Sequence, residues 1–350
     1  MNDYFCVLPF YSYEILHPNG PNVHCCRLAP NTQIESVRNS MMQGQRSPAC
    51  SACWRLEDSG LNSERILHNT AMDFYLNQDI EKIEHDAFIG GYQTRLIKLA
   101  TSNLCNGTCV TCNSSLSSAW ASLENKPIKY QIQNQNKLQE IDFSQIVQLS
   151  FVGGEPLLER TNFDILQQII DTGNINCFVS IVTNGSCSLD KSALDLLRQF
   201  KNLNICLSID GIDRVFEYMR YPLRWNQLVV NIDLFKTLAT HVSVSAMISN
   251  LNIVYYSQMI DFFHQQNLTY LFKQVEHPGI FSPGNLPPAA KQFVLERNSR
   301  HSDHVKAFLS CGSYTPGSWD KLRKEILRQD QLKGIQIQNH LPEISSYINL

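Results

Sequence analysis

The stretch Leu96–Cys112 reads LIKLATSNLCNGTCVTC, and it decides the fold. Its first five residues form an apolar, strand-like run. A polar loop follows, with three cysteines spaced Cys-x-x-x-Cys-x-x-Cys, at Cys105, Cys109 and Cys112. Three closely spaced thiolates can hold a 4Fe-4S cluster and leave one iron open to a small molecule. The alternative is a zinc site, which would need a fourth ligand from elsewhere in the chain.

A second strand-like run, 146–152, ends in Gly153-Gly154-Glu155-Pro156. Glycine has no side chain, so the backbone there can approach a bound ligand closely; an ordinary turn is the alternative. The two motifs, in this order and each after a strand, resemble those of the radical S-adenosylmethionine (SAM) enzymes.

The resemblance implies two roles. The open iron of a cluster on the three cysteines binds the amino and carboxylate groups of SAM, and the Gly-Gly-Glu-Pro turn contacts the methionyl amine. One position departs from the pattern, because Thr111 stands where many relatives have a bulky apolar residue that packs against the cluster and the adenine.

From about residue 93 the sequence alternates short apolar runs with amphipathic stretches, which predicts repeated βα units on a parallel sheet. The predicted strands are 95–101, 146–152, 177–183, 203–209, 242–248 and 268–274. The predicted helices between them are 161–172, 189–200, 227–239 and 255–266. A doubly wound sheet would give a similar pattern. The resemblance implies an α/β fold with a partial (β/α)6 TIM-type barrel.

Small polar residues follow several of these strands, where βα barrels carry their chemistry. Asn184 follows the third strand, Ser208 and Asp210 end the fourth, and Asn250 follows the fifth. A turn or a helix cap is the structural alternative for each. The resemblance places all four around SAM and the substrate.

Two arginines stand beside aromatic residues after the fourth strand, Arg220 and Arg224. A guanidinium group matches a carboxylate in a two-point contact, as the carboxylate of SAM would require, whereas many arginines simply lie on the surface. In radical SAM relatives of similar sequence the first arginine approaches SAM, so the resemblance favours Arg220. The sequence identifies no catalytic side chain.

The resemblance extends to cysteines near the amino terminus. Cys6, Gly20, Cys25, Cys50 and Cys53 reproduce in order the opening of the auxiliary-cluster domains called SPASM and twitch. Four thiolates leave no open iron, so the implied auxiliary 4Fe-4S cluster would pass an electron or orient the substrate. A four-cysteine zinc knot has the same spacing and is the alternative.

A turn signal at 18–21 between residues 10–17 and 22–26 predicts a hairpin that brings the first two of these cysteines together. Adjacent side chains in a strand face opposite sides, so only one of Cys25 and Cys26 faces the same metal as its partner. The spacing from the turn selects Cys25.

The chain is predicted to comprise three parts. These are a small α+β twitch-like domain with its linker at 1–92, the radical SAM barrel at 93–282, and a helical extension at 283–350. Further residues that match the amino-terminal twitch proteins are Trp54, Glu57, Gly60, Ser63 and Arg65.

Composition limits the function classes. The formal net charge of the 350 residues is −3, which predicts no basic face for nucleic acid. No apolar stretch reaches the roughly 18 to 20 residues of a membrane span, and the amino terminus lacks a positively charged signal region. Eight of the twelve cysteines fall in two groups with ligand-like spacings, and the other four are scattered. We therefore expect a cytoplasmic protein that makes no membrane contact.

The predicted function is that of a radical SAM enzyme. The resemblance implies reductive cleavage of SAM to a 5′-deoxyadenosyl radical, which abstracts hydrogen from an unactivated carbon of a ribosomally made peptide or a small natural-product intermediate. The electron would come from a reductase such as flavodoxin or ferredoxin. The alternative is a non-catalytic iron-sulfur electron carrier or metal-binding scaffold, which would need neither an open iron nor a SAM pocket.

Overall fold

The computed structural model describes residues 3–15, 33–58, 60, 63–76, 79–128, 141–275, 277–310 and 314–348. The chain divides into two compact units. Unit 1 comprises Met1–Ser102, Tyr130–Ile181 and Asp190–Leu203, and unit 2 comprises Asn103–Lys129, Val182–Leu189 and Asn204–Leu350. The three parts predicted from the sequence remain a prediction.

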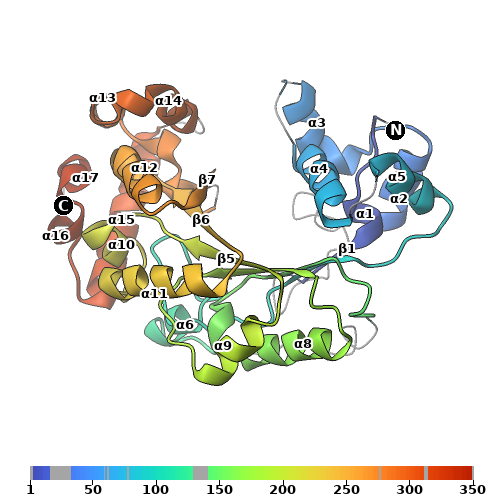
Figure 1. Ribbon diagram of the computed structural model, residues 1–350. Helices are drawn as coiled ribbons and strands as arrows, with labels where there is room; N and C mark the ends of the chain where they lie inside the picture. Colours follow the sequence, from blue (N-terminus) through green and yellow to red (C-terminus); the bar gives the residue numbers. More distant parts are fainter. Residues whose placement is uncertain are drawn as a thin grey trace. The chain divides into compact units, whose positions relative to one another are not determined.

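Seven strands form a sheet in which their order follows the sequence (Figure 1). They are β1 (Ser12–Ile15), β2 (Leu96–Leu99), β3 (Gln148–Phe151), β4 (Phe178–Thr183), β5 (Asn202–Ser208), β6 (His241–Ile248) and β7 (Thr269–Gln274). The ladders β1–β2, β2–β3, β3–β4, β5–β6 and β6–β7 are all parallel. The six predicted strands correspond to β2–β7. The predicted α/β class is confirmed, and the sheet is consistent with a partial barrel.

Strand β1 is a member of this sheet that the sequence pattern does not predict. The turn signal predicts residues 10–17 as one arm of a local hairpin, which stays a prediction; within this arm Ser12–Ile15 pairs in parallel with β2, from Ser12 opposite Leu96 to Ile15 opposite Leu99. The second arm, 22–26, lies outside the described residues. The amino-terminal segment thus extends the sheet beyond the first predicted strand.

The helices of unit 1 fall in two stretches of the chain. The amino-terminal ones are α1 (Leu8–Tyr11), α2 (Ile34–Met42), η1 (Pro48–Cys50), α3 (Ser51–Asp58), α4 (Glu64–Leu76) and α5 (Ile80–Phe88). After β3 come η2 (Pro156–Leu158), α8 (Arg160–Asp171) and, after β4, α9 (Lys191–Leu197). Helix α8 is capped by Glu159, whose carboxylate accepts a hydrogen bond from the Thr161 N–H.

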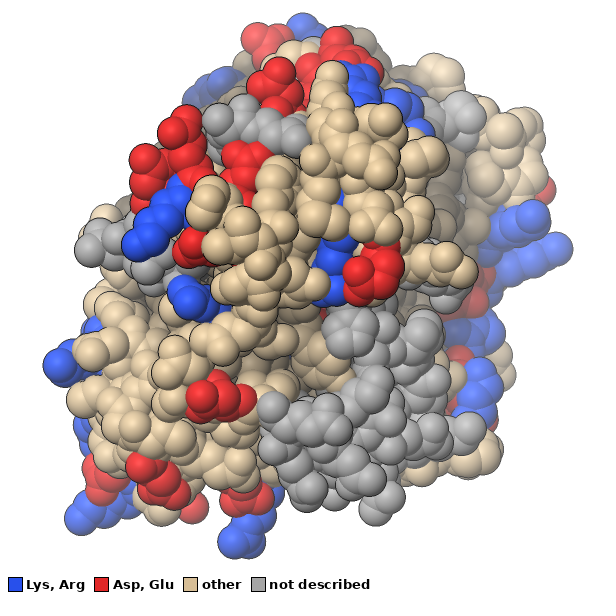
Figure 2. All heavy atoms as spheres, turned by 90° about the vertical axis from the view of Figure 1, so that its right-hand side faces the viewer, with Lys and Arg blue, Asp and Glu red and all other residues tan. Residues whose placement is uncertain are grey.

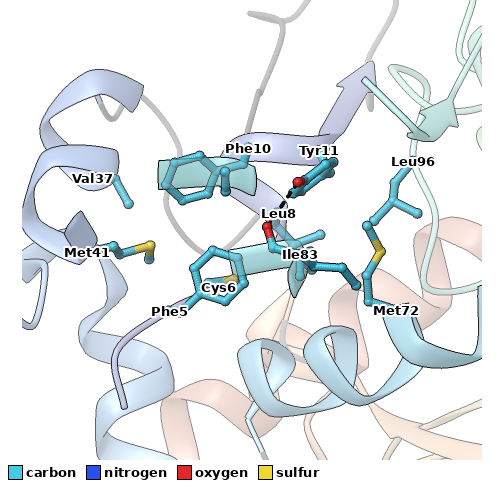
Figure 3. Packing of buried hydrophobic residues seen from close by; sticks show 12 residues of the cluster. Phe5, Cys6, Leu8, Phe10, Tyr11, Val37, Met41, Met72, Ile83 and Leu96 are labelled. Atoms are coloured by element: carbon cyan, nitrogen blue, oxygen red, sulfur yellow. Dashed lines mark hydrogen bonds between the residues drawn. The ribbon is translucent and has the colours of Figure 1, made fainter. Parts of the chain in front are cut away.

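The amino-terminal helices close around an apolar core, which Figure 3 shows from close by. Phe5, Phe10, Met41 and Ile83 are at most 3% exposed, and Cys6 packs among them. Burying a side chain of this size contributes about 1.5–3 kcal/mol. This core, which also includes Leu96 of β2, surrounds the backbone around Cys6.

The helices of unit 2 comprise those among the strands, of which α11 contacts β6 and α12 contacts β7, and a helical tail, as predicted. Those among the strands are α6 (Ser118–Leu123), α10 (Asp213–Met219), α11 (Trp225–Leu238), η3 (Ile253–Tyr255) and α12 (Tyr256–Gln265). The tail comprises η4 (Gly279–Phe281), η5 (Pro283–Asn285), α13 (Pro288–Arg297), η6 (Ser299–His301), α14 (Ser302–Ser310), α15 (Pro316–Lys333), α16 (Ile337–His340) and α17 (Pro342–Ile348).

The sequence contains signals for both ends of helix α15. Thr315 and Ser318 form a capping box at its start, and Pro316 occupies the first turn. Gly334 ends it with a left-handed φ of 67°, a conformation that favours glycine. The last helical residue, Lys333, is therefore fixed in position.

Acidic and basic side chains are interspersed over the face drawn in Figure 2, as the small net charge leads one to expect. Within the described residues, no helix combines the length and the apolar character that crossing a bilayer requires.

Candidate metal centre and SAM site

The cysteine loop, residues 105–112, turns around Gly107. The Gly107 N–H donates to Cys105 Sγ at 3.4 Å. A Cβ atom at position 107 would lie 3.5 Å from Cys109 Sγ and 3.8 Å from Cys105 Sγ. Two of the three sulfurs thus face the one position in the loop that has no side chain, and this keeps their surroundings open to a bound group.

Backbone hydrogen bonds from the segment after α10 hold the loop in place. Thr108 N and Oγ1 both donate to the Tyr221 carbonyl, at 2.6 and 3.0 Å. Val110 N donates to the Met219 carbonyl at 2.9 Å. The residue between these two acceptors is Arg220, so the same contacts that shape the cysteine loop also position this arginine.

Helix α6 holds the loop through side chains. Trp120, which is 1% exposed, donates its indole N–H to the Cys109 carbonyl at 2.9 Å. Ser117 Oγ donates to the Gly107 carbonyl at 2.7 Å. Preorganisation of this kind lets a ligand bind without the cost of ordering a flexible loop.

Burial favours the protonated thiols of Cys109 and Cys112 when no metal is bound. It raises the pKa of Cys109, and together with the neighbouring Cys109 it raises the pKa of Cys112 to about 12. Metal ligation requires the thiolate, and a bound cation supplies the stabilisation that burial removes.

Among the described residues, no three Cys, His, Asp or Glu side chains converge on a point where one metal ion would fit. A 4Fe-4S cluster places a different demand on its ligands, because each thiolate binds a different iron.

Asp210 and Arg220 form a buried ion pair beside the loop. Arg220 Nη2 lies 2.7 Å from Asp210 Oδ2, and the two side chains are 12% and 3% exposed. Arg220 Nη1 also lies 3.9 Å from Cys109 Sγ. Burial alone would lower the pKa of Arg220, but Asp210 and then Cys109 outweigh that effect and raise it. The guanidinium is therefore charged and faces a predicted cluster ligand.

The other carboxylate oxygen of Asp210, Oδ1, accepts a hydrogen bond from Met247 N at 2.7 Å. The sequence predicts that Asp210 contacts SAM. In the structure its carboxylate contacts Arg220 and Met247 N, and its contact with SAM stays a prediction.

Among the buried polar atoms of unit 2 that have no hydrogen-bond partner in the described part of the chain are Arg220 Nε, Asn250 Oδ1 and Asn103 Oδ1. Buried polar atoms are nearly always paired, so each unpaired atom calls for an explanation. Arg220 Nε offers a donor, which suits a carboxylate, and the two amide oxygens offer acceptors, which suit amino or hydroxyl groups. Each of these atoms is therefore available to a polar ligand, and two of them belong to residues selected from the sequence.

Asn184 belongs to a hydrogen-bonded group with the cysteine loop. Its Nδ2 donates to Asn106 Oδ1 at 2.8 Å, and Asn106 Nδ2 donates to Ser186 Oγ at 2.8 Å. Asn106 is the residue after Cys105, so the end of β4 is tied directly to the first cysteine. Ser208, at the end of β5, is half-buried.

Sequence reasoning missed Asn252, which is completely buried. Its Nδ2 donates to the carbonyls of Asp210 and Met247 at 2.8 and 2.7 Å, and its Oδ1 accepts from Ser249 N at 2.7 Å. Asn252 thus joins the ends of β5 and β6. The signal was the second asparagine in Asn250-Leu251-Asn252, which is typical of a turn.

The Gly153–Pro156 turn lies in unit 1, at the end of β3. Gly153 has φ of 106°, and a Cβ there would lie 2.9 Å from Ala100 Cβ and 3.1 Å from the Ser102 carbonyl oxygen. Glu155 is buried and its Oε1 accepts from Leu157 N at 3.1 Å. The backbone conformation and the close neighbours at position 153 therefore require glycine whether or not a ligand is bound.

Gly153→Ala is expected to destabilise the protein by about 2–3 kcal/mol, because it adds a steric clash to an unfavourable positive φ. Gly173→Ala is the matched control, since Gly173 has φ of 79° but a Cβ there would meet no other atom within 4 Å. The control should cost only about 1 kcal/mol, from the positive φ alone. Urea denaturation of both variants measures the difference, and equal losses would contradict the clash.

The amino-terminal cysteines of the described chain lie in unit 1. Cys6 and Cys53 are buried, and Cys50 is half-buried at the end of η1. Asn69 on α4 fixes the backbone on both sides of Cys6, because it accepts from Val7 N at 3.0 Å and donates to the Phe5 carbonyl at 2.8 Å. Gly20, Cys25 and Cys26 lie outside the described residues.

Helix α3, which carries Cys53, is joined to α4 by a buried ion pair. Arg65 Nη2 lies 2.7 Å from Glu57 Oε2, with side-chain exposures of 11% and 12%. Arg65 also donates to the Phe5 carbonyl at 2.8 Å and lies 5.1 Å from the centre of the Trp54 ring. Four of the residues that match the twitch pattern, Trp54, Glu57, Ser63 and Arg65, thus form one network between α3 and the Cys6 segment.

The Glu57–Arg65 network predicts that the folding stability of the protein depends on pH. Burial by itself raises the pKa of Glu57, but hydrogen bonds from Arg65 and Ser63 outweigh it and lower the pKa below its usual value. A carboxylate whose pKa is lower in the folded state stabilises the fold above its unfolded pKa of about 4.3, and that contribution is lost as the pH falls through the folded value. The wild type should therefore lose more stability than Glu57→Gln between pH 6 and pH 3, as measured by the unfolding free energy at each pH.

Comparison with known proteins adds independent information. None of the protein-family models matches the sequence. The chain is 24% identical over 222 residues to the radical SAM cyclopropyl synthase TigE of Paramaledivibacter caminithermalis, a match that covers 58% of this chain and 46% of that protein. The chain thus matches about half the length of this curated relative.

Two solved structures are similar at low identity. A structure of anSMEcpe with bound AdoMet gives a TM-score of 0.43 at 17% identity, with 67% of this chain and 66% of that chain covered. Streptococcus suis SuiB bound to S-adenosylmethionine gives 0.44 at 13% identity, with 83% and 65% covered. The cysteine loop and the Gly-Gly-Glu-Pro turn thus occur in a chain whose sequence is similar to that of a radical SAM enzyme, TigE.

Proposed function

We propose that this protein is a radical SAM enzyme whose 4Fe-4S cluster is held by Cys105, Cys109 and Cys112. The observation that carries the proposal is the preorganised loop, in which two sulfurs face Gly107 and the Asp210–Arg220 pair lies beside Cys109. When bound, the cluster and SAM supply the chemistry, which is reductive cleavage to methionine and a 5′-deoxyadenosyl radical that abstracts hydrogen from an unactivated carbon.

The chain's own residues bind and orient SAM. Arg220 donates to the carboxylate of SAM through Nε, which is buried and has no partner within the described chain. Asp210 keeps the guanidinium plane aligned. Asn250 Oδ1 accepts from a ligand N–H or O–H, while its Nδ2 is held by the Ile280 carbonyl at 2.8 Å. The Gly153–Pro156 turn binds the methionyl amine of SAM, and Asn184 and Ser208 complete the contacts.

We further propose that Cys6, Cys25, Cys50 and Cys53 hold an auxiliary 4Fe-4S cluster. The positions of Cys6, Cys50 and Cys53 in unit 1 support it, since the Asn69 and Glu57–Arg65 contacts fix the segments that carry them. A cluster with four thiolates has no open iron, so its role is electron transfer or substrate orientation. Iron analysis distinguishes it from a zinc knot.

The proposed substrate is a ribosomally made peptide or a small natural-product intermediate, and the electron donor is a flavodoxin or ferredoxin. The twitch resemblance and the similarity to a cyclopropyl synthase support chemistry at an unactivated carbon. The deciding experiment incubates anaerobically reconstituted, dithionite-reduced protein with SAM. We expect 5′-deoxyadenosine and methionine in equal amounts.

The competing proposal is an electron carrier or metal scaffold. It predicts clusters that reduce and reoxidise without consuming SAM. The unpartnered atoms of Arg220 and Asn250 in the described chain favour the enzyme, because a carrier has no need of a polar ligand site. Reduced protein with full iron content that leaves SAM intact would establish the carrier instead.

A further inference from the structure

Helix α15 places a lysine in the interior beside the cysteine loop. Lys333 is 6% exposed, and its Nζ lies 4.7 Å from the centre of the Trp120 ring. Nζ also donates to Gln329 Oε1 at 2.9 Å. In the described part of the chain no carboxylate lies within ion-pair distance of it. Lysine is almost never fully buried unless it is paired, so a buried lysine without a direct ion pair suits a nearby anionic group.

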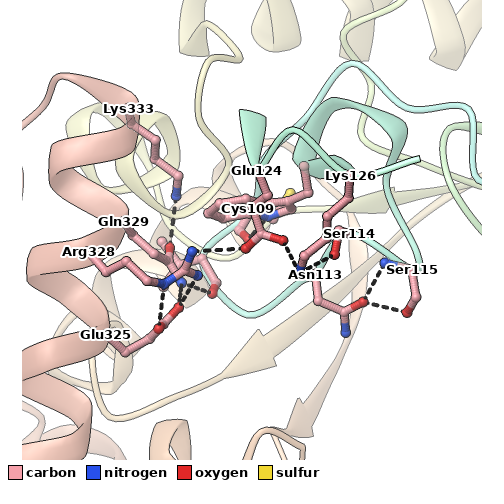
Figure 4. A network of polar contacts seen from close by, with 12 residues as sticks. Cys109, Asn113, Ser114, Ser115, Glu124, Lys126, Glu325, Arg328, Gln329 and Lys333 are labelled. Atoms are coloured by element: carbon pink, nitrogen blue, oxygen red, sulfur yellow. Dashed lines mark hydrogen bonds and ion pairs between the residues drawn. The ribbon is translucent and has the colours of Figure 1, made fainter. Parts of the chain in front are cut away.

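The lysine and its neighbours contact the cysteine loop from one side, as Figure 4 shows. Trp120 donates its indole N–H to the Cys109 carbonyl at 2.9 Å. Gln329, one helical turn before Lys333, donates to the Val110 carbonyl at 3.0 Å. The residues that hold the lysine thus also bind the backbone of two consecutive loop residues, which sets the position of the charge relative to the loop.

The pKa of Lys333 also reflects its burial beside the cysteine loop. Burial lowers the pKa of Lys333 to about 8, and Cys109 is the largest of the groups that counteract the lowering. The other cation near Cys109 is Arg220, whose charge is already balanced by Asp210 at 2.7 Å. Asp330 and Glu325 also counteract the lowering, but among the described residues neither carboxylate lies within ion-pair distance of Nζ, so Lys333 has no direct ion-pair partner there. Three thiolates around a 4Fe-4S core carry a net negative charge, which increases by one when an electron is added.

We propose that Lys333, held by Trp120 and Gln329, is a positioning residue that sets the reduction potential of the cluster on Cys105, Cys109 and Cys112. This inference rests on the proposed function. The electron comes from the one-electron donor that the reaction already requires, and no bond to Lys333 forms or breaks. Its positive charge stabilises the more negative, reduced state and so makes electron transfer from the donor more favourable.

The test is a redox titration of the reconstituted full-length protein with dithionite, followed by electron paramagnetic resonance. The signal that changes on addition of SAM identifies this cluster. In Lys333→Met, we expect the ratio of reduced to oxidised cluster at a fixed potential to fall about tenfold, which corresponds to a 59 mV decrease for one electron. Lys333→Arg, which keeps the charge on a larger head group, should stay within about twofold of the wild type.

Lys324→Met is the matched control, because Lys324 is an exposed lysine on the same helix. It should titrate as the wild type does. If Lys333→Met does not fold, Lys333→Gln provides the same test of charge with a side chain that still donates to Gln329. An unchanged potential in a charge-removing variant with full iron content would overturn the inference. Failure of the wild type itself to bind iron would instead overturn the proposed function.

Discussion

Replacement of Cys105, Cys109 and Cys112 by alanine is expected to abolish 5′-deoxyadenosine formation. These residues are the proposed ligands of the cluster with an open iron, and the auxiliary set has four cysteines of its own. Iron content should fall from about eight to about four atoms per chain, because one of two four-iron clusters is lost. The measurements are product formation by chromatography and iron analysis of anaerobically purified protein.

The matched control removes two cysteines that belong to neither set, Cys177 and Cys206. Burial raises the pKa of both, that of Cys177 to about 12, which is typical of inert thiols. Cys177→Ala with Cys206→Ala should therefore retain product formation and full iron content. Deoxyadenosine production by the triple variant would contradict the assignment of the cluster.

The sheet was predictable because its strands are nearly continuous apolar runs. In β4, for example, Val179 and Ile181 are buried and the intervening residues are half-buried. Strand β1 was not predicted from the sequence, because Ser12-Tyr13-Glu14-Ile15 has little apolar character and its partner β2 lies far along the chain. Local patterns predict local pairing, so the turn signal at 18–21 favours a hairpin. Parallel pairing depends on tertiary contacts that no short segment encodes.

The residues of the candidate site also divide into those that the sequence predicts and those that it does not. Cysteine spacing and the Gly-Gly-Glu-Pro turn carry the chemistry in the sequence itself, whereas the residues that support them look ordinary. Lys333 and Gln329 belong to a helix rich in charged residues, a composition that normally indicates a solvated face. Their burial follows only from how α15 packs on the cysteine loop. Asn69 and Asn252 are further examples, since their function is to satisfy backbone groups distant in sequence.

Asp210→Ala should be the most destabilising single substitution in the site. It leaves Arg220 as a buried charge without its partner, which typically costs about 3–5 kcal/mol, and it removes the acceptor for Met247 N. Asp261→Ala is the control. Asp261 lies at the same 2.7 Å from Arg300, but those side chains are 53% and 66% exposed, so the loss should be at most about 1 kcal/mol. Unfolding in urea measures both, and similar losses would show that the Asp210–Arg220 pair contributes little.

Replacing both Asp210 and Arg220 distinguishes the contribution of the ion pair to folding stability from the contribution of Arg220 to SAM binding. In Asp210→Leu with Arg220→Met, apolar side chains replace the ion pair, and such replacements are often neutral or stabilising. Most of the lost stability should therefore return. SAM affinity should not, because the donor to its carboxylate is gone, and a lost charge-assisted contact of about 1.5–3 kcal/mol weakens binding roughly tenfold or more. Calorimetry with SAM distinguishes the two roles: full affinity in the double variant would mean that Arg220 serves the fold alone.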